Sequence, residues 1–269
     1  MGNFILFFKK ETVELIKTVK GVVLVIIFIF IAISSPILAK LTPEIMKWAA
    51  DSVDNATTSS DAQSAMNALT SLVPPPTSDS SYAQFFSNFN QIGLLALIIV
   101  FAGIVANEKS KNTASYILTQ NISRRQFILS KFASCAVFTI VSVIIAMACQ
   151  ILYTNILFDD KNILFQNVML YSVMLFLYLI FILTIVMFSS VVSKSVTPAT
   201  FVAFLIFIVF NILTAVPKIG KYMPPEINNF GILTQTKSLG DLAVNIMITV
   251  VCSAVFLIAS LELFNRQEL

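Results

Sequence analysis

The sequence predicts an all-α, polytopic membrane protein with six transmembrane helices. Hydrophobic residues make up 57% of its 269 residues and charged residues only 12%, whereas about a quarter of a soluble domain is charged. Apolar, charge-free runs of about 18 residues or more recur along the chain, and such a run crosses about 30 Å of hydrocarbon as a helix. The runs are apolar all round and lack the period-two alternation of a transmembrane β-barrel.

The six runs form one membrane domain over residues 21–269. They cover residues 21–39, 85–106, 132–158, 163–192, 196–216 and 242–261. Lys and Arg gather on one side of the predicted membrane, which holds eleven of them against six on the other. Because cytoplasmic connections carry the excess of these residues, we expect both termini in the cytoplasm. The abundance of Ile, Phe, Lys and Asn suggests an AT-rich bacterial source, and hence the bacterial plasma membrane.

Residues 1–20 are expected to form an amphipathic helix in the membrane interface. Its apolar positions recur at helical spacing, and its charged positions gather opposite them. The apolar set is Ile5, Phe8, Leu15, Ile16 and Val19, and the charged set is Lys9, Lys10, Glu14 and Lys17. Two compatible roles remain open, an anchor in membrane lipid and a contact with a cytoplasmic partner.

Two polar stretches interrupt the apolar pattern on the predicted external side. In the first, residues 40–84, Thr42 and Pro43 have the form of a helix start. Residues 62–72 repeat an amphipathic pattern before three prolines, so we expect a short helical hairpin. The second stretch, residues 217–241, is rich in Pro and Gly, and we expect short helices that dip back toward the membrane.

Several function classes lack the residues that they need. The chain has no histidine, which removes the commonest general base and metal ligand, so we assign no catalytic or metal-binding residue and expect no enzyme activity. The span centres carry no ionisable residue, which argues against an ion-coupled carrier. No glycine-rich phosphate loop is present, so any ATP must be bound by a different polypeptide. No basic patch with interleaved aromatic residues indicates a nucleic-acid partner.

The long polar segment at residues 107–131 separates the second and third runs on the predicted cytoplasmic side. Residues 113–119, TASYILT, are expected to form a short helix whose apolar surface is Tyr116, Ile117 and Leu118. Ser123 then begins an S-x-x-Q capping box, which predicts a helix continuing into the third span. A solvated loop that obeys the positive-inside rule is the alternative interpretation.

The motifs of this segment are Glu108, KNTASYIL at residues 111–118 and ISRRQFILSK at residues 122–131. They resemble the pattern of ABC-2 type permease subunits of ATP-binding-cassette exporters. In that pattern a glutamate closes the second span, a short helix follows, and a Ser-Arg pair, an apolar triplet and a lysine open the third. Asn112 departs from the pattern, in which Gly is commoner. The six spans, the interfacial leader and the broken external stretch extend the resemblance over the whole chain.

The resemblance implies a half-transporter that exports a hydrophobic or amphipathic compound, such as a peptide antibiotic, a drug or a lipid. Two permease subunits, like or unlike, join two separate ATPase subunits that bind ATP and Mg, while this chain binds no cofactor. The short helix at residues 113–118 is then a coupling helix that docks on the ATPase. The implied coupling residues are Glu108, Thr113, Tyr116, Ile117, Leu118, Arg124 and Arg125.

Amide side chains near the predicted outer ends of the spans are candidates for a substrate pathway. They are Asn88, Gln91, Gln150, Asn155 and Asn211. Hydrogen bonds between helices are an equally common role for such residues in membranes. Two alternatives to an exporter subunit remain open, a stand-alone secondary carrier and a non-transport membrane protein such as an immunity factor or a scaffold.

Overall fold

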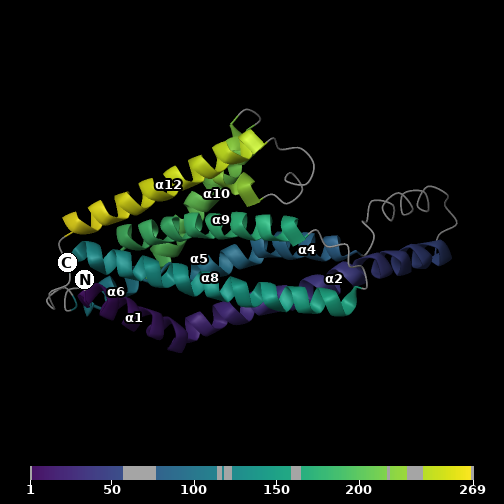
Figure 1. The fold of residues 1–269 in the computed structure, drawn as a ribbon, viewed down its shortest axis with the longest axis horizontal. Coiled ribbons are helices and arrows are strands. Elements are labelled where there is room, and N and C mark those ends of the chain that lie inside the picture. Colours follow the sequence, from purple (N-terminus) through teal and green to yellow (C-terminus); the bar gives the residue numbers. More distant parts are fainter. Residues whose placement is uncertain are drawn as a thin grey trace.

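The computed structural model shows long helices that run side by side (Figure 1). It describes residues 2–56, 77–113, 117, 123–158, 165–216, 219–228 and 239–267, and contains no strand among them. Six segments are long and apolar enough to cross a membrane. They are Val19–Met46, Ser78–Ser110, Arg124–Leu157, Val168–Val192, Val196–Thr214 and Leu242–Arg266. The predicted fold class and the six predicted spans are therefore confirmed.

The described elements follow one another along the chain as the sequence pattern indicates. They are α1 (Gly2–Lys17), α2 (Val19–Ala56), α4 (Ser78–Asn88), the π-helical turn η1 (Phe89–Gly93), α5 (Leu94–Phe101), α6 (Ala106–Ser110), α8 (Arg124–Leu157), α9 (Phe165–Val192), α10 (Val196–Thr214), the 3₁₀ turns η2 (Gly220–Tyr222) and η3 (Pro224–Asn228), and α12 (Leu239–Arg266). Both termini lie at the same end of the bundle, which we call the terminal end (Figure 1). The opposite end, where α2 projects and α4 begins, is the insertion end.

Helix α9 forms the centre of the bundle. Its most apolar stretch is 72% buried, whereas the corresponding stretches of α10 and α12 are only 11% and 17% buried. Phe181 of α9 packs its ring against Phe210 of α10 and Phe256 of α12, with centroid distances of 5.1 and 6.4 Å. The outer faces of α10 and α12 therefore present apolar side chains, as helices in contact with lipid tails do.

Helix α2 corrects the predicted boundary of the external insertion. It runs without interruption through Pro36 and Pro43 to Ala56, so the predicted helix start at Thr42 is wrong. The Thr42 hydroxyl donates to the carbonyl of Leu38 at 2.6 Å and thus bonds back along the same helix instead of capping a new one. Its 38 residues span about 57 Å, which exceeds the hydrocarbon core and explains the projecting end. Residues 62–72, the predicted second helix of the hairpin, lie outside the described residues.

Helix α1 confirms a helix in the N-terminal segment but buries a different face from the one the apolar pattern suggests. Ile5 and Ile16 are 62% and 57% exposed, so they are available to lipid. Phe7 and Glu11 are buried instead, and α1 packs on α8 through this face. The acidic side chain in the protein-facing stripe is the feature that the sequence analysis missed.

The stretch at residues 217–241 forms short helices where the structure describes it. Ile227 and Asn228 of η3 are buried, and η3 packs against α9 and α12. The described part of this stretch therefore packs on the bundle. Residues 217–218 and 229–238 lie outside the described residues.

Candidate functional site

The second span is broken near its terminal end. Helix α5 ends at Phe101, α6 begins at Ala106, and turns connect them. The hydroxyl of Ser190 on α9 accepts hydrogen bonds from the backbone N–H groups of Val105 and Ala106, both at 3.0 Å. Since unsatisfied backbone donors are costly in a membrane, α9 stabilises the break directly.

Small residues allow the other helices to approach this break. Ala102 and Ala106 form a buried cluster with Ala199 of α10. A side chain at Gly103 would place its Cβ 3.0 Å from a methyl group of Val196, which is closer than ordinary van der Waals contact. These contacts agree with the tight packing that small residues favour between membrane helices.

Lys131 joins three helices through two buried ion pairs. Its Nζ lies 2.7 Å from Oε2 of Glu11 on α1 and 2.7 Å from Oε1 of Glu108 on α6. Lys131 is 2% exposed, and the rings of Phe7 and Phe127 lie 5.9 and 5.2 Å from its ammonium group. A charge buried in this way must be paired, so Lys131 fixes α1 and α6 on the start of α8.

Lys109 connects the same short helix to the end of α9. Its Nζ donates to the carbonyl of Val191 at 2.6 Å and to Oε1 of Gln267 at 2.8 Å. The Gln267 amide also donates to the Val191 carbonyl at 3.0 Å. Carbonyls in the last turn of a helix have no hydrogen-bond donor within the helix. At the end of α9, Lys109 and Gln267 both donate to the carbonyl of Val191.

Arg124 holds the end of α12. Its guanidinium donates to the carbonyls of Asn265 and Gln267 at 3.0 and 2.6 Å. A cation at a helix C-terminus also complements the helix dipole. Arg125, the next residue, is exposed. Of the two arginines that the resemblance implies for ATPase contact, the structure turns Arg124 toward α12 and Arg125 toward the outside.

Asn112 lies in the turn that follows α6. Its φ angle is 56°, in the left-handed region that only Gly, and less often Asn or Asp, adopts at low cost. Glycine adopts this conformation without strain, so it is the residue that could replace Asn112 here most easily. The hydroxyl of Thr113 then donates to the carbonyl of Glu108 at 3.1 Å, which fixes the turn against α6.

The predicted coupling helix is described only at Thr113 and Ile117, and both residues are helical. Tyr116 and Leu118 lie outside the described residues. Ile117 packs partly against a buried cluster that includes Phe127 and Phe264. The predicted capping box at Ser123 is confirmed, because Ser123 Oγ accepts from the N–H of Gln126 and the Gln126 side chain accepts from the N–H of Ser123.

We call these six side chains the terminal-end network: Glu11, Glu108, Lys109, Arg124, Lys131 and Gln267. The network connects the segment between the second and third spans to α1, α8, α9 and α12. Ion pairs and hydrogen bonds thus connect α6 to four other helices. Sequence reasoning assigned no site role to Glu11, Lys109, Lys131 or Gln267. The position of Glu11 four residues after Phe7 and four before Leu15, within an apolar stripe, was an available signal.

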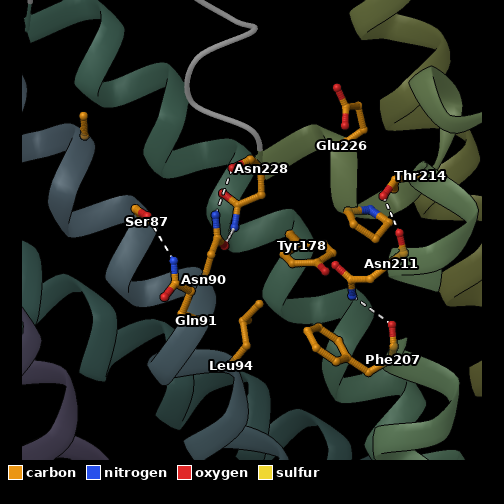
Figure 2. A pocket seen from close by; sticks show the side chains of 12 residues that line it. Ser87, Asn90, Gln91, Leu94, Tyr178, Phe207, Asn211, Thr214, Glu226 and Asn228 are labelled. Atoms are coloured by element: carbon orange, nitrogen blue, oxygen red, sulfur yellow. Dashed lines mark hydrogen bonds between the residues drawn. The ribbon is translucent and has the colours of Figure 1, made fainter. Parts of the chain in front are cut away.

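A second candidate site is a cavity of about 490 Å³ at the insertion end (Figure 2). Two predicted pathway residues, Gln91 and Asn211, line it, together with Asn90, Tyr178 and Asn228. Sequence reasoning missed these last three, although Asn90 lies directly before the predicted Gln91 in the sequence. The π-helical turn η1 carries Asn90 and Gln91, and such turns occur frequently at functional sites.

The other three predicted pathway residues lie elsewhere. Asn88 donates to Ser35 Oγ at 3.1 Å. Gln150 is buried and donates to Ser81 Oγ at 3.0 Å, so it joins α8 to α4 as an interhelical hydrogen bond. Asn155 is exposed on α8 outside the cavity lining. The structure therefore divides the predicted set into two residues that share a cavity and three that do not.

Comparison with known families places this architecture among proteins without an assigned activity. A family model described as a protein of unknown function, DUF2705, matches residues 67–269. The matched range contains five of the six spans, the segment between the second and third spans and the cavity. No curated protein matches the sequence. Among the described residues, no group of three or more Cys, Asp or Glu side chains is arranged to hold a metal ion.

Proposed function

The chain belongs to DUF2705, a family of proteins of unknown function, and we propose that it is the permease subunit of an ABC-2 type transporter. It forms the membrane pathway for ATP-driven export of a hydrophobic or amphipathic compound. The ATP and Mg are bound by separate ATP-binding-cassette subunits, and a second permease subunit, identical or different, completes the pathway.

One observation carries this proposal. The segment between the second and third spans presents an exposed surface at Lys111, Thr113 and Arg125, while its neighbours Glu108 and Lys131 are ion-paired within the bundle. A partner that docks on the exposed surface therefore acts on α1, α8, α9 and α12 at once. A coupling element needs this combination of an accessible face and rigid internal connections, because it must bias a whole bundle between two states.

The distribution of charge supports the proposed orientation. Helix α6, which carries Lys109, and the start of α8, which carries Arg124 and Arg125, lie at the terminal end with both termini (Figure 1). Positively charged ends of membrane proteins face the cytoplasm. The docking surface then faces the compartment that contains ATP. We place the protein in the bacterial plasma membrane.

The location of the buried charges favours an external energy source. Glu11 and Lys131 are the buried charged residues in the part of the chain that the structure describes, and they pair with each other where α1 packs on α8. Ion-coupled carriers usually hold an ionisable residue near the membrane midplane, where the binding site changes access. This arrangement favours an ATP-driven subunit over a secondary carrier.

The test is vanadate-sensitive ATP hydrolysis that co-purifies with a tagged chain from its native membrane in mild detergent. We expect Arg125→Glu to remove most of this activity, because it reverses a charge on the docking surface. Arg266→Glu is the matched control, since Arg266 is exposed at the same end on α12. An absence of associated ATPase from the unmodified protein, or equal losses in both variants, contradicts the proposal.

A further inference from the structure

The cavity at the insertion end is lined on four sides by six elements and is partly open to the outside. The turn η1 with its neighbouring helices α4 and α5 forms one wall, α9 and α10 form two others, and η3 of the external stretch forms the fourth (Figure 2). Its volume of about 490 Å³ is within the range of small-molecule sites, about 300–1,000 Å³. The site therefore has room for the head of an amphipathic molecule.

Amide groups are held in fixed positions around this cavity. Asn90 donates to the backbone carbonyl of Asn228 at 3.0 Å, and the Asn228 amide donates back to the Asn90 side chain (Figure 2). This pair fixes η3 on the second span. Across the cavity, Asn211 donates to the carbonyl of Phe207 at 2.8 Å, which leaves its amide oxygen turned toward the hydroxyl of Tyr178 (Figure 2). The polar groups are thus oriented before any ligand enters, which lowers the entropic cost of binding.

The charge of the lining selects against anions. The described residues that line the cavity include no Lys or Arg, and Glu226 contributes a carboxylate. An anionic head such as a phosphate or a sulfate loses its hydration on entering and gains no cation from the described lining. Amides and hydroxyls both donate and accept hydrogen bonds, so they suit uncharged groups that do the same.

Apolar surface continues from the cavity onto the outside of the bundle. Leu94 and Phe207 line the cavity together with the ring of Tyr178. On the adjoining helix α10, Ile208 and Ile212 are 48% and 63% exposed. A hydrocarbon tail attached to a bound head group can therefore lie along α10 within the bilayer.

We propose that this cavity binds the uncharged, hydroxyl- or amide-bearing head of an amphipathic molecule, whose tail lies along α10. Gln91 and Asn211 contact the head, and the Asn90–Asn228 pair forms the wall that shapes the site. The proposal of a binding site depends only on the cavity and its lining. The further role of this site as the loading site of an exporter rests on the proposed function.

The test uses three photoreactive probes with the same diazirine-bearing dodecyl tail. Their heads are glucose, a glycyl-asparagine amide and a sulfate, and the protein is held in lipid nanodiscs without nucleotide. We expect the glucoside or the dipeptide amide to label peptides of α4, α5 and α10 about tenfold more than the sulfate does, as the loss of one or two hydrogen bonds predicts. Comparison of the two uncharged probes identifies whether hydroxyl or amide heads are preferred. Equal labelling by all three probes, or absence of labelling at these peptides, overturns the proposal.

Two variants tie the labelling to the cavity. Asn211→Leu and Gln91→Leu each lower the specific labelling about tenfold, because each removes one polar contact with the head. The matched control is Asn155→Leu, which makes the same substitution on an exposed amide outside the cavity. If Asn211→Leu does not fold, Gln91→Leu provides the test, because Gln91 is exposed and its replacement leaves the packing of the bundle unchanged. Unchanged labelling in Gln91→Leu, or an equal loss in the control, overturns the proposal.

The outcome is independent of the ATPase test. Selective labelling without any associated ATPase supports the binding site and rejects the exporter assignment. Vanadate-sensitive hydrolysis with unselective labelling rejects the binding site alone.

Discussion

Lys131 Nζ lies 2.7 Å from Oε1 of Glu108, although the two residues are separated by the whole segment between the second and third spans. These are the glutamate and the lysine that begin and end the sequence pattern on which the resemblance to ABC-2 permeases rests. The pairing gives that spacing a physical reason, because the two residues close the base of the segment on the bundle. The presence of Glu11 in the same contact extends the closure to the N-terminal helix.

Lys131→Met is expected to destabilise the protein strongly. The substitution leaves Glu108 without its cation and leaves Glu11 with only the exposed Lys10, at 3.3 Å, and breaking a buried pair costs about 3–5 kcal/mol. Thermal unfolding in nanodiscs measures the loss as a lower midpoint. Lys9→Met, which removes an exposed lysine of α1, is the control.

A combined variant separates the charge effect from lost packing. If uncompensated charge dominates, Glu11→Gln and Glu108→Gln added to Lys131→Met recover a large part of the midpoint. A Lys131→Met midpoint equal to that of Lys9→Met shows instead that the buried pairs contribute little to stability.

The sequence was sufficient for the spans because each one is apolar over its full membrane length. It was insufficient at the ends of α2 and α1, for different reasons. Thr42 and Pro43 have the composition of a helix start, but a hydrogen bond back to Leu38 and the continuing helix override that local signal. For α1, apolarity alone could not distinguish a lipid-facing side from a protein-facing side, since both are apolar in a membrane.

Arg124→Gln is expected to loosen the last turn of α12, whereas Arg125→Gln is not. Arg124 supplies donors to the carbonyls of Asn265 and Gln267, and hydrogen bonds to a charged group contribute about 1.5–3 kcal/mol. Hydrogen exchange of the α12 C-terminal peptide measures the change as faster exchange. The exposed Arg125 is the matched control in the same helix turn. Similar exchange rates in the two variants contradict a stabilising role of Arg124 at the end of α12.

Asn112→Gly is expected to preserve stability and Asn112→Val to reduce it. At a φ of 56° a β-branched side chain meets the backbone, which costs about 1–2 kcal/mol, while glycine avoids this contact. The thermal midpoints of the two variants test this difference. A valine variant as stable as the glycine variant shows that Asn112 is not held in the left-handed conformation.

The candidate pathway residues show what amide composition can and cannot predict. Gln91 and Asn211 were identified because they are polar residues near span ends, and they do share the cavity. Gln150 is also a polar residue near a span end, but its side-chain amide donates hydrogen bonds to the hydroxyls of Ser81 and Thr154 instead of lining the cavity. The difference depends on which helices are neighbours, and a single sequence with six similar apolar runs does not contain that information.

Asn245 is expected to be a site where an apolar residue increases stability. It is fully buried in α12, and neither its amide nitrogen nor its amide oxygen has a hydrogen-bond partner in the described part of the chain. A buried polar group left unpaired costs about 1–3 kcal/mol, so Asn245→Leu removes that cost while keeping a similar volume. Thr249→Val is the comparison one turn later, where the hydroxyl is already bonded to the carbonyl of Asn245. We expect a higher thermal midpoint for Asn245→Leu and no comparable gain for Thr249→Val. A lower midpoint for Asn245→Leu, measured on the purified chain, shows that the amide makes a stabilising contact and rejects this account.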